Sequence, residues 1–131
     1  AQGGAVGGLP AAAAALAANS QRQRSVYFEF DNYSIEPTYQ DMLAQHAKVL
    51  VAEPSVSIRI EGHADDRGSA EYNLALGQRR ADAVKRALNI LGVPDQQLRA
   101  TSWGEEKPQE AGENESAWAR NRFAELVYPS N

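Results

Sequence analysis

The chain has 131 residues, enough for one domain with a single hydrophobic core. Its net charge of −4 and pI near 5.2 argue against a protein that binds nucleic acid through the phosphate backbone. It contains no cysteine, which excludes disulfides, thiolate zinc sites and cysteine nucleophiles. No apolar run approaches the ~20 residues that a membrane-spanning helix needs, and no signal peptide is visible.

Residues 1–24 differ in composition from the rest of the chain. They are rich in alanine and glycine and contain no aromatic residue. Such a segment offers little apolar surface to offset the entropy lost on ordering, so we expect a flexible tether here. The sequence therefore predicts one folded domain, residues 25–131, preceded by this tether.

The first strand and the first helix of the domain are predicted by two different periodicities. Residues 25–31, SVYFEFD, alternate apolar and polar side chains and predict a strand. Residues 38–53 carry apolar side chains at helical spacing, and Pro37 suits the first turn of that helix. His46 falls on the apolar face of this helix, where we expect a hydrogen-bonded core histidine.

The remaining elements continue the alternation. Residues 55–62 predict a second strand, a charged turn follows at 62–69, and a long helix is expected from about Ala70 to Leu91. Two further strands are expected at 96–104 and 122–129, joined by a polar loop. The order β-α-β-α-β-β predicts an α+β two-layer sandwich, with a mixed sheet, helices on one face and a closing hairpin. The expected core consists of Val26, Phe28, Phe30, Val56, Ile58, Ile60, Val84 and Leu88.

One charged residue falls on the apolar stripe of the long helix. On a helical wheel Arg80 and Asn73 lie among Leu76, Val84 and Leu88. An unpaired buried charge is costly, so Arg80 requires an anionic partner. Three aspartates are candidates because they are expected at the same end of the sheet as the first turn of this helix: Asp31, Asp65 and Asp66. Such a cluster could hold both ends of a zwitterion, with an ammonium on the aspartates and a carboxylate on Arg80.

The residues alone leave other interpretations open. Asp65 and Arg80 could form a purely structural ion pair. His63 with Asp65 and Asp66 could bind a metal, although one histidine and flexible carboxylates are weak evidence. Paired carboxylates could also indicate a glycosidase, but a neighbouring arginine lowers the pKa of a carboxyl and would spoil the required acid.

Four segments together resemble a known family. VYFEFDNYSI, IEGHADDRGSAEYNLALGQRRADAVKRAL, TSWGEEKP and NRFAELVY follow one another as in the OmpA-like peptidoglycan-binding domain, particularly in members of the Tol–Pal system. The resemblance covers residues 25–128. It implies a non-catalytic module, without a cofactor or metal, that binds the diaminopimelate residue of the peptidoglycan stem peptide.

The resemblance also implies roles for individual residues. Asp65 would hold the ammonium and Arg80 the carboxylate of diaminopimelate. The other residues implied to form the same site are Phe30, Asp31, Asn32, Arg67, Asn73 and Leu76. The family usually has a second arginine where this chain has Phe123, which puts any role of that position in doubt.

The implied setting is the periplasmic face of the outer membrane in Gram-negative bacteria. There the domain would tie the membrane to the wall, anchored by a lipid on an N-terminal cysteine that this sequence lacks. The implied protein partner is TolB, with other Tol proteins as further candidates, and no nucleic acid is expected. Two alternatives remain: a module whose main role is to bind TolB, and a cell-wall hydrolase.

Overall fold

Alternating apolar and polar residues produce a four-stranded sheet in the computed structural model, which describes residues 8–129. The strands are β1 (Ser25–Tyr27), β2 (Ile58–His63), β3 (Leu98–Gly104) and β4 (Phe123–Val127). Their spatial order is β1-β4-β2-β3. β2 and β3 are parallel, whereas β4 runs antiparallel to both β1 and β2. The predicted α+β architecture with a mixed sheet is confirmed.

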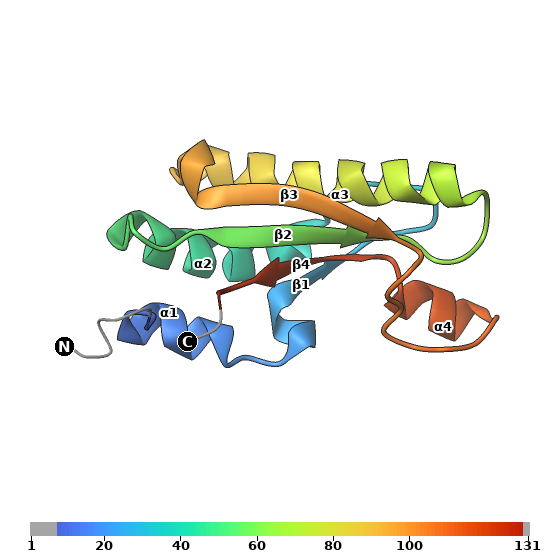
Figure 1. Ribbon diagram of the computed structural model, residues 1–131, viewed down its shortest axis with the longest axis horizontal. Coiled ribbons are helices and arrows are strands. Elements are labelled where there is room, and N and C mark those ends of the chain that lie inside the picture. Colours follow the sequence, from blue (N-terminus) through green and yellow to red (C-terminus); the bar gives the residue numbers. More distant parts are fainter. Residues whose placement is uncertain (1–7, 130–131) are drawn as a thin grey trace.

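Two long helices cover one face of this sheet (Figure 1). α2 spans Gln40–Ala52 and follows a short 3-10 turn that begins at Pro37. α3 spans Ala70–Ile90, and the side chain of Ser69 caps it by accepting a hydrogen bond from the backbone N–H of Tyr72. The helical periodicity therefore predicted both elements to within a few residues.

α3 approaches the sheet unusually closely because glycines face each other at the contact. A side chain added at Gly62 would place its Cβ only 1.7 Å from the carbonyl oxygen of Gly77. Neither position therefore tolerates a larger residue without a shift of backbone. Three residues after Gly77, nearly one helical turn on, Arg80 is held directly beside the end of β2.

The predicted core is largely confirmed, with one correction. Seven of the eight predicted core residues are at most 3% exposed: Val26, Phe28, Val56, Ile58, Ile60, Val84 and Leu88. Phe30 was expected among them but is 58% exposed. The reason is local: β1 ends at Tyr27, and Asp31 adopts a positive φ of 54°, so the alternation of the strand no longer applies at residue 30.

The expected closing hairpin is also wrong. β4 does not pair with β3 but lies between β1 and β2. The loop between β3 and β4 contains α4 (Glu115–Arg120), which the side chain of Asn114 caps. This loop carries the chain from the end of β3 past β2 to the start of β4. β1 and β2 still point in the same direction, so their carboxyl ends meet at one edge as predicted.

The structure differs from a simple tether over part of residues 1–24. α1 (Ala11–Ala17) packs against α2, and Ala13 and Leu16 are buried in the core cluster beside Tyr128. The segment thus contributes two small apolar contacts that its composition did not suggest. Residues 1–7 lie outside the described residues, and the domain boundary at residue 24 stays a prediction.

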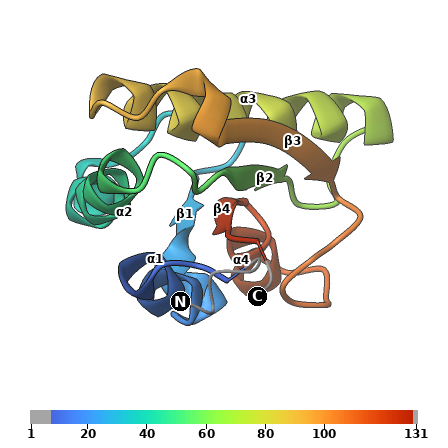
Figure 2. The ribbon, with the colours of Figure 1, turned by 60° about the vertical axis from the view of Figure 1, so that its left-hand side comes forward.

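Figure 1 places α1 and the end of β4 at one end of the molecule, and the turn before α3 together with α4 at the other. Figure 2 shows α3 on one side of the strands and α1 on the other. Among residues 8–129, no helix combines the length and apolar character needed to cross a membrane.

Candidate functional site

A cavity of about 220 Å³ opens at the sheet edge where β2 ends and α3 begins. Most of the residues proposed from the sequence meet there, whereas Asn32 and Asp66 do not line the cavity. The lining residues are Phe30, Asp31, Ala64, Asp65, Arg67, Gly68, Tyr72, Asn73, Leu76 and Arg80.

Arg80 forms the floor of this cavity and is fully buried at 0% exposure. Its guanidinium donates to three backbone carbonyls: Nε to Asn32 at 2.8 Å, Nη1 to His63 at 2.9 Å and Nη2 to Glu29 at 3.2 Å. The predicted carboxylate partner is therefore wrong, because no ion pair of Arg80 occurs among the described residues. Carbonyl dipoles solvate the charge in place of an anion.

The surroundings make the charge of Arg80 costly without removing it. Burial, followed by the positive charge of Arg122, lowers the pKa of Arg80 to about 10. The guanidinium thus remains protonated at neutral pH. Three of its five N–H groups donate to the carbonyls, which leaves two donors for a bound anion.

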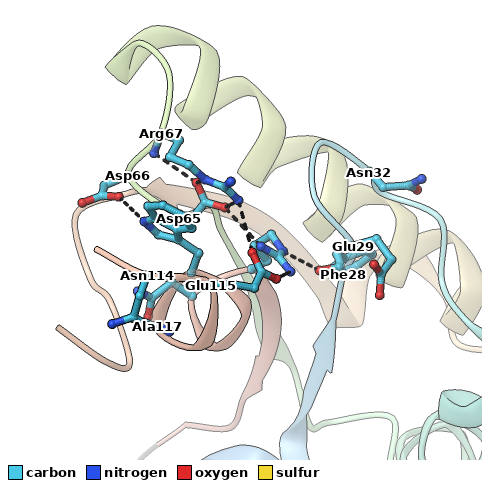
Figure 3. Close-up of polar contacts among 12 residues, drawn as sticks. Phe28, Glu29, Asn32, Asp65, Asp66, Arg67, Asn114, Glu115 and Ala117 are labelled. Atoms are coloured by element: carbon cyan, nitrogen blue, oxygen red, sulfur yellow. Dashed lines mark hydrogen bonds and ion pairs between the residues drawn. The ribbon is translucent and has the colours of Figure 1, made fainter. Parts of the chain in front are cut away.

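Asp65 pairs with two other arginines instead (Figure 3). Its Oδ1 accepts from the backbone N–H of Arg67 at 3.0 Å, and its Oδ2 accepts from Arg67 Nη2 at 2.9 Å. Arg122 Nη1 lies 3.5 Å from the same Oδ2. Burial alone would raise the pKa of Asp65, but the hydrogen bonds and charge of Arg67, with help from Arg122, lower it below its usual value.

Arg67 is a partly exposed cation at the rim of the cavity. Its guanidinium lies between two aromatic rings, 4.2 Å from the centroid of Phe30 and 4.0 Å from that of Trp118. The indole N–H of Trp118 donates to Asp66 at 3.0 Å, which joins α4 to the turn before α3. Asp66 therefore supports the rim and does not line the cavity.

The remaining predicted residues shape the walls. Asp31 accepts a hydrogen bond from the hydroxyl of Tyr72, which raises the pKa of that tyrosine. Asn73 is 2% exposed and donates to Glu105 at 2.7 Å. Asn32 contributes its backbone carbonyl to Arg80, while its side chain accepts from the N–H of Ser34.

The sequence analysis missed Arg122 as a site residue. It is 4% exposed, and besides Asp65 it contacts the carbonyl of Phe28 at 2.9 Å and Glu115 at 3.1 Å. No periodic pattern marks it, because it lies directly before a five-residue strand. Its neighbour Phe123 stacks on the ring of His63 at a centroid distance of 4.0 Å and does not enter the cavity.

Fold and cavity together define a class of α+β domain in which a buried arginine and acidic side chains share one pocket. Residues 27–122 match the model of the OmpA family, and this chain belongs to that family. The resemblance found in the sequence is thereby confirmed.

Proteins with the name "Peptidoglycan-associated lipoprotein" are among the relatives of this chain. The one from Pasteurella multocida is 50% identical over 108 residues, covering 82% of this chain and 72% of the relative. The one from Pseudomonas aeruginosa is 43% identical over 126 residues, covering 96% of this chain and 72% of the relative.

Solved structures agree with this assignment. The peptidoglycan-associated lipoprotein from Burkholderia pseudomallei has a TM-score of 0.80 and 56% identity, over 81% of this chain and 90% of the other. The C-terminal domain of Helicobacter pylori MotB has a TM-score of 0.73 at 23% identity, over 82% of this chain and 84% of the other, and shows the same fold.

Proposed function

We propose that this domain binds peptidoglycan non-covalently, without cleaving it, through the diaminopimelate residue of the stem peptide. The observation that carries the proposal is the buried Arg80, which lines one cavity together with Asp31 and Asp65 and has two N–H groups that donate to no carbonyl. The names of its relatives, "Peptidoglycan-associated lipoprotein", support the same ligand.

Diaminopimelate carries an ammonium and a carboxylate at the end of its side chain, and the cavity offers a complementary group for each. The carboxylate would accept the two remaining N–H groups of Arg80. The ammonium would bind Asp65, sharing that carboxylate with Arg67 or displacing the Arg67 side chain. Displacement is feasible because this side chain is 32% exposed, whereas that of Arg122 is only 5% exposed.

Calorimetric titration with two stem peptides tests this assignment. A diaminopimelate-containing peptide should bind, and a lysine-containing peptide, which lacks the side-chain carboxylate, should bind at least tenfold more weakly. That factor corresponds to losing about one charged hydrogen bond in a desolvated site. Equal affinity for the two peptides would remove Arg80 from the proposed role.

Incubation with purified sacculi tests the non-catalytic part. Sedimentation of the protein with the sacculi, with no soluble fragments, is the expected result. Release of muropeptides would instead identify a wall hydrolase. The lowered pKa of Asp65 supports the non-catalytic role, because a carboxyl that stays ionised near neutral pH cannot serve as a general acid.

We further propose that the domain ties the outer membrane to the wall. The cavity lies at the opposite end of the molecule from α1, so a membrane anchor preceding α1 would leave the cavity facing the wall (Figure 1). In this role residues 1–24 act as the tether, with α1 as its docked part.

A second partner is favoured by apolar residues around the cavity. Four large side chains are about half exposed at this end of the molecule: Phe30, Tyr33, Tyr72 and Leu74. Such a group is typical of a protein-binding surface, and we propose TolB as its partner. Saturating TolB should then lower sacculus binding, and wall fragments should weaken TolB binding by the same factor. Additive, independent binding would separate the two surfaces.

A further inference from the structure

A second polar cluster lies on the sheet face that points away from α3. Glu61 and His63 alternate with Ile60 and Gly62 along β2, so their side chains share this face. Glu125 of β4 is the direct cross-strand partner of Glu61. One carboxylate oxygen of each glutamate and one ring nitrogen of His63 lie within 4.8 Å of one another.

The two carboxylates face each other in a poorly hydrated place. Their side chains are only 14% and 13% exposed, and like charges directly opposite each other destabilise a sheet. Each carboxylate pairs with one arginine: Arg59 Nε lies 3.0 Å from Glu61, and Arg24 Nη1 lies 2.7 Å from Glu125. The cluster thus requires positive charge, which the arginines now supply from its edges.

His63 has a different status from these paired groups. It is 3% exposed, and neither ring nitrogen has a hydrogen-bond partner among residues 8–129. Buried polar atoms are nearly always satisfied, so two unpartnered nitrogens on one buried ring require an explanation. The stacked ring of Phe123, with an interplanar angle of 9°, fixes the plane of the imidazole. The sequence had suggested Asp65 and Asp66 as companions of His63, but Asp65 instead pairs with arginines.

We propose that Glu61, His63 and Glu125 form a binding site for a divalent transition-metal ion of the zinc type. One imidazole and two carboxylates are ligands that such an ion accepts, with water in a fourth position. Bonds of about 2.0–2.2 Å at tetrahedral angles place ligand atoms about 3.4 Å apart. Modest rotation of the two glutamate side chains closes the gap from the observed spacing. Binding displaces Arg24 and Arg59 from the two carboxylates.

Calorimetric titration with zinc chloride tests the site, on protein purified without a polyhistidine tag and treated with chelator. The unmodified protein should bind one ion. Glu61→Gln and Glu125→Gln keep the side-chain shape and should each weaken binding at least tenfold. Glu113→Gln removes the same charge from the exposed loop before α4 and should leave the affinity unchanged. Calcium prefers six to eight oxygen ligands and should not bind here.

Arg24→Gln provides the opposite test because it removes the charged competitor for Glu125, while the neutral amide of Gln21 stays on the other carboxylate oxygen at 2.9 Å. We expect this variant to bind zinc several-fold more tightly than the unmodified protein. Zinc should also shift the ring resonances of His63 in NMR spectra and leave those of His46 in place. If the glutamate variants bind zinc as well as Glu113→Gln does, or if Arg24→Gln weakens binding, the proposed ligands are wrong. These glutamine variants keep the His63–Phe123 stack, so the test does not depend on replacing the buried histidine.

Discussion

The floor and the rim of the cavity both present an arginine, but the two are held in opposite ways. Arg80 at the floor is completely buried, and carbonyl dipoles, not a paired carboxylate, solvate its charge. Arg67 at the rim is partly exposed and already pairs with Asp65 between two aromatic rings. A cation solvated by dipoles keeps its full charge for an incoming anion, whereas a cation paired with a carboxylate has little left. The floor should therefore control affinity, and the rim should adjust it.

Replacing Arg80 should have the largest effect. Arg80→Ala removes three hydrogen bonds from a charged group and a large buried side chain, so it should destabilise the fold by about 3–5 kcal/mol, besides abolishing sacculus binding. Arg80→Lys keeps a charge but cannot present two parallel N–H groups, so it too should lose binding while melting closer to the unmodified protein. Arg79→Lys, on the exposed side of α3, is the matched control. Sacculus binding retained by folded Arg80→Lys would contradict the role of the floor.

Asp65→Asn should have the next largest effect. The amide preserves the shape but removes the buried one of the two carboxylate partners of Arg122 and leaves it the exposed Glu115, which should cost about 2–4 kcal/mol of stability. Loss of the carboxylate should also weaken binding of the diaminopimelate-containing peptide by one to two orders of magnitude. Thermal melts run beside calorimetric titration separate the two effects. A variant that loses stability yet keeps its affinity would make the carboxylate structural only.

Lowering the pH should reduce the stability of the protein in two steps, one from the core and one from the site. His46 is 1% exposed, its Nδ1 lies 2.6 Å from the hydroxyl of Tyr128, and burial lowers its pKa to about 4. Between pH about 6.5 and 4 the unfolded chain binds a proton there that the folded chain does not, so stability should fall as pH decreases through this window. Asp65, whose pKa is lowered, should lose its contribution only below about pH 4.

Urea melts at several pH values measure both losses. The loss above pH 4 should persist in Asp65→Asn, because it arises from the core. The loss below pH 4 should become smaller in that variant. A single transition, the same in both proteins, would contradict the separate titration of the two groups.

Periodicity predicted the parts of this molecule that one burial pattern governs. The stripe of α3 that contains Asn73, Leu76 and Val84 is buried as expected, and so is Arg80 within it. His46 is a hydrogen-bonded core histidine as predicted, since its neighbours on α2 are buried too. Helical and strand periods survive in the sequence because many residues repeat the same signal.

Features set by a few long-range contacts were missed. Nothing local indicates that Arg80 meets carbonyls of residues 29, 32 and 63, because those carbonyls belong to segments that the fold brings together. The insertion of β4 between β1 and β2 is likewise a choice of topology that a short strand does not encode. Arg122 and Trp118 were missed for the same reason, because each acts through contacts with residues far away in the chain.

The smallest effect should come from the rim. There, two substitutions of Trp118 distinguish the contribution of its ring from that of its indole hydrogen bond. Trp118→Phe keeps an aromatic face against Arg67 but removes the indole donor to Asp66. We expect less than a twofold change in peptide affinity, since exposed hydrogen bonds and ion pairs contribute little. Trp118→Ala also removes the ring and should weaken binding several-fold, consistent with a cation–π contact of about 0.5–1 kcal/mol. If either variant matched the loss seen in Arg80→Lys, the rim would control affinity and the contrast with the floor would be wrong.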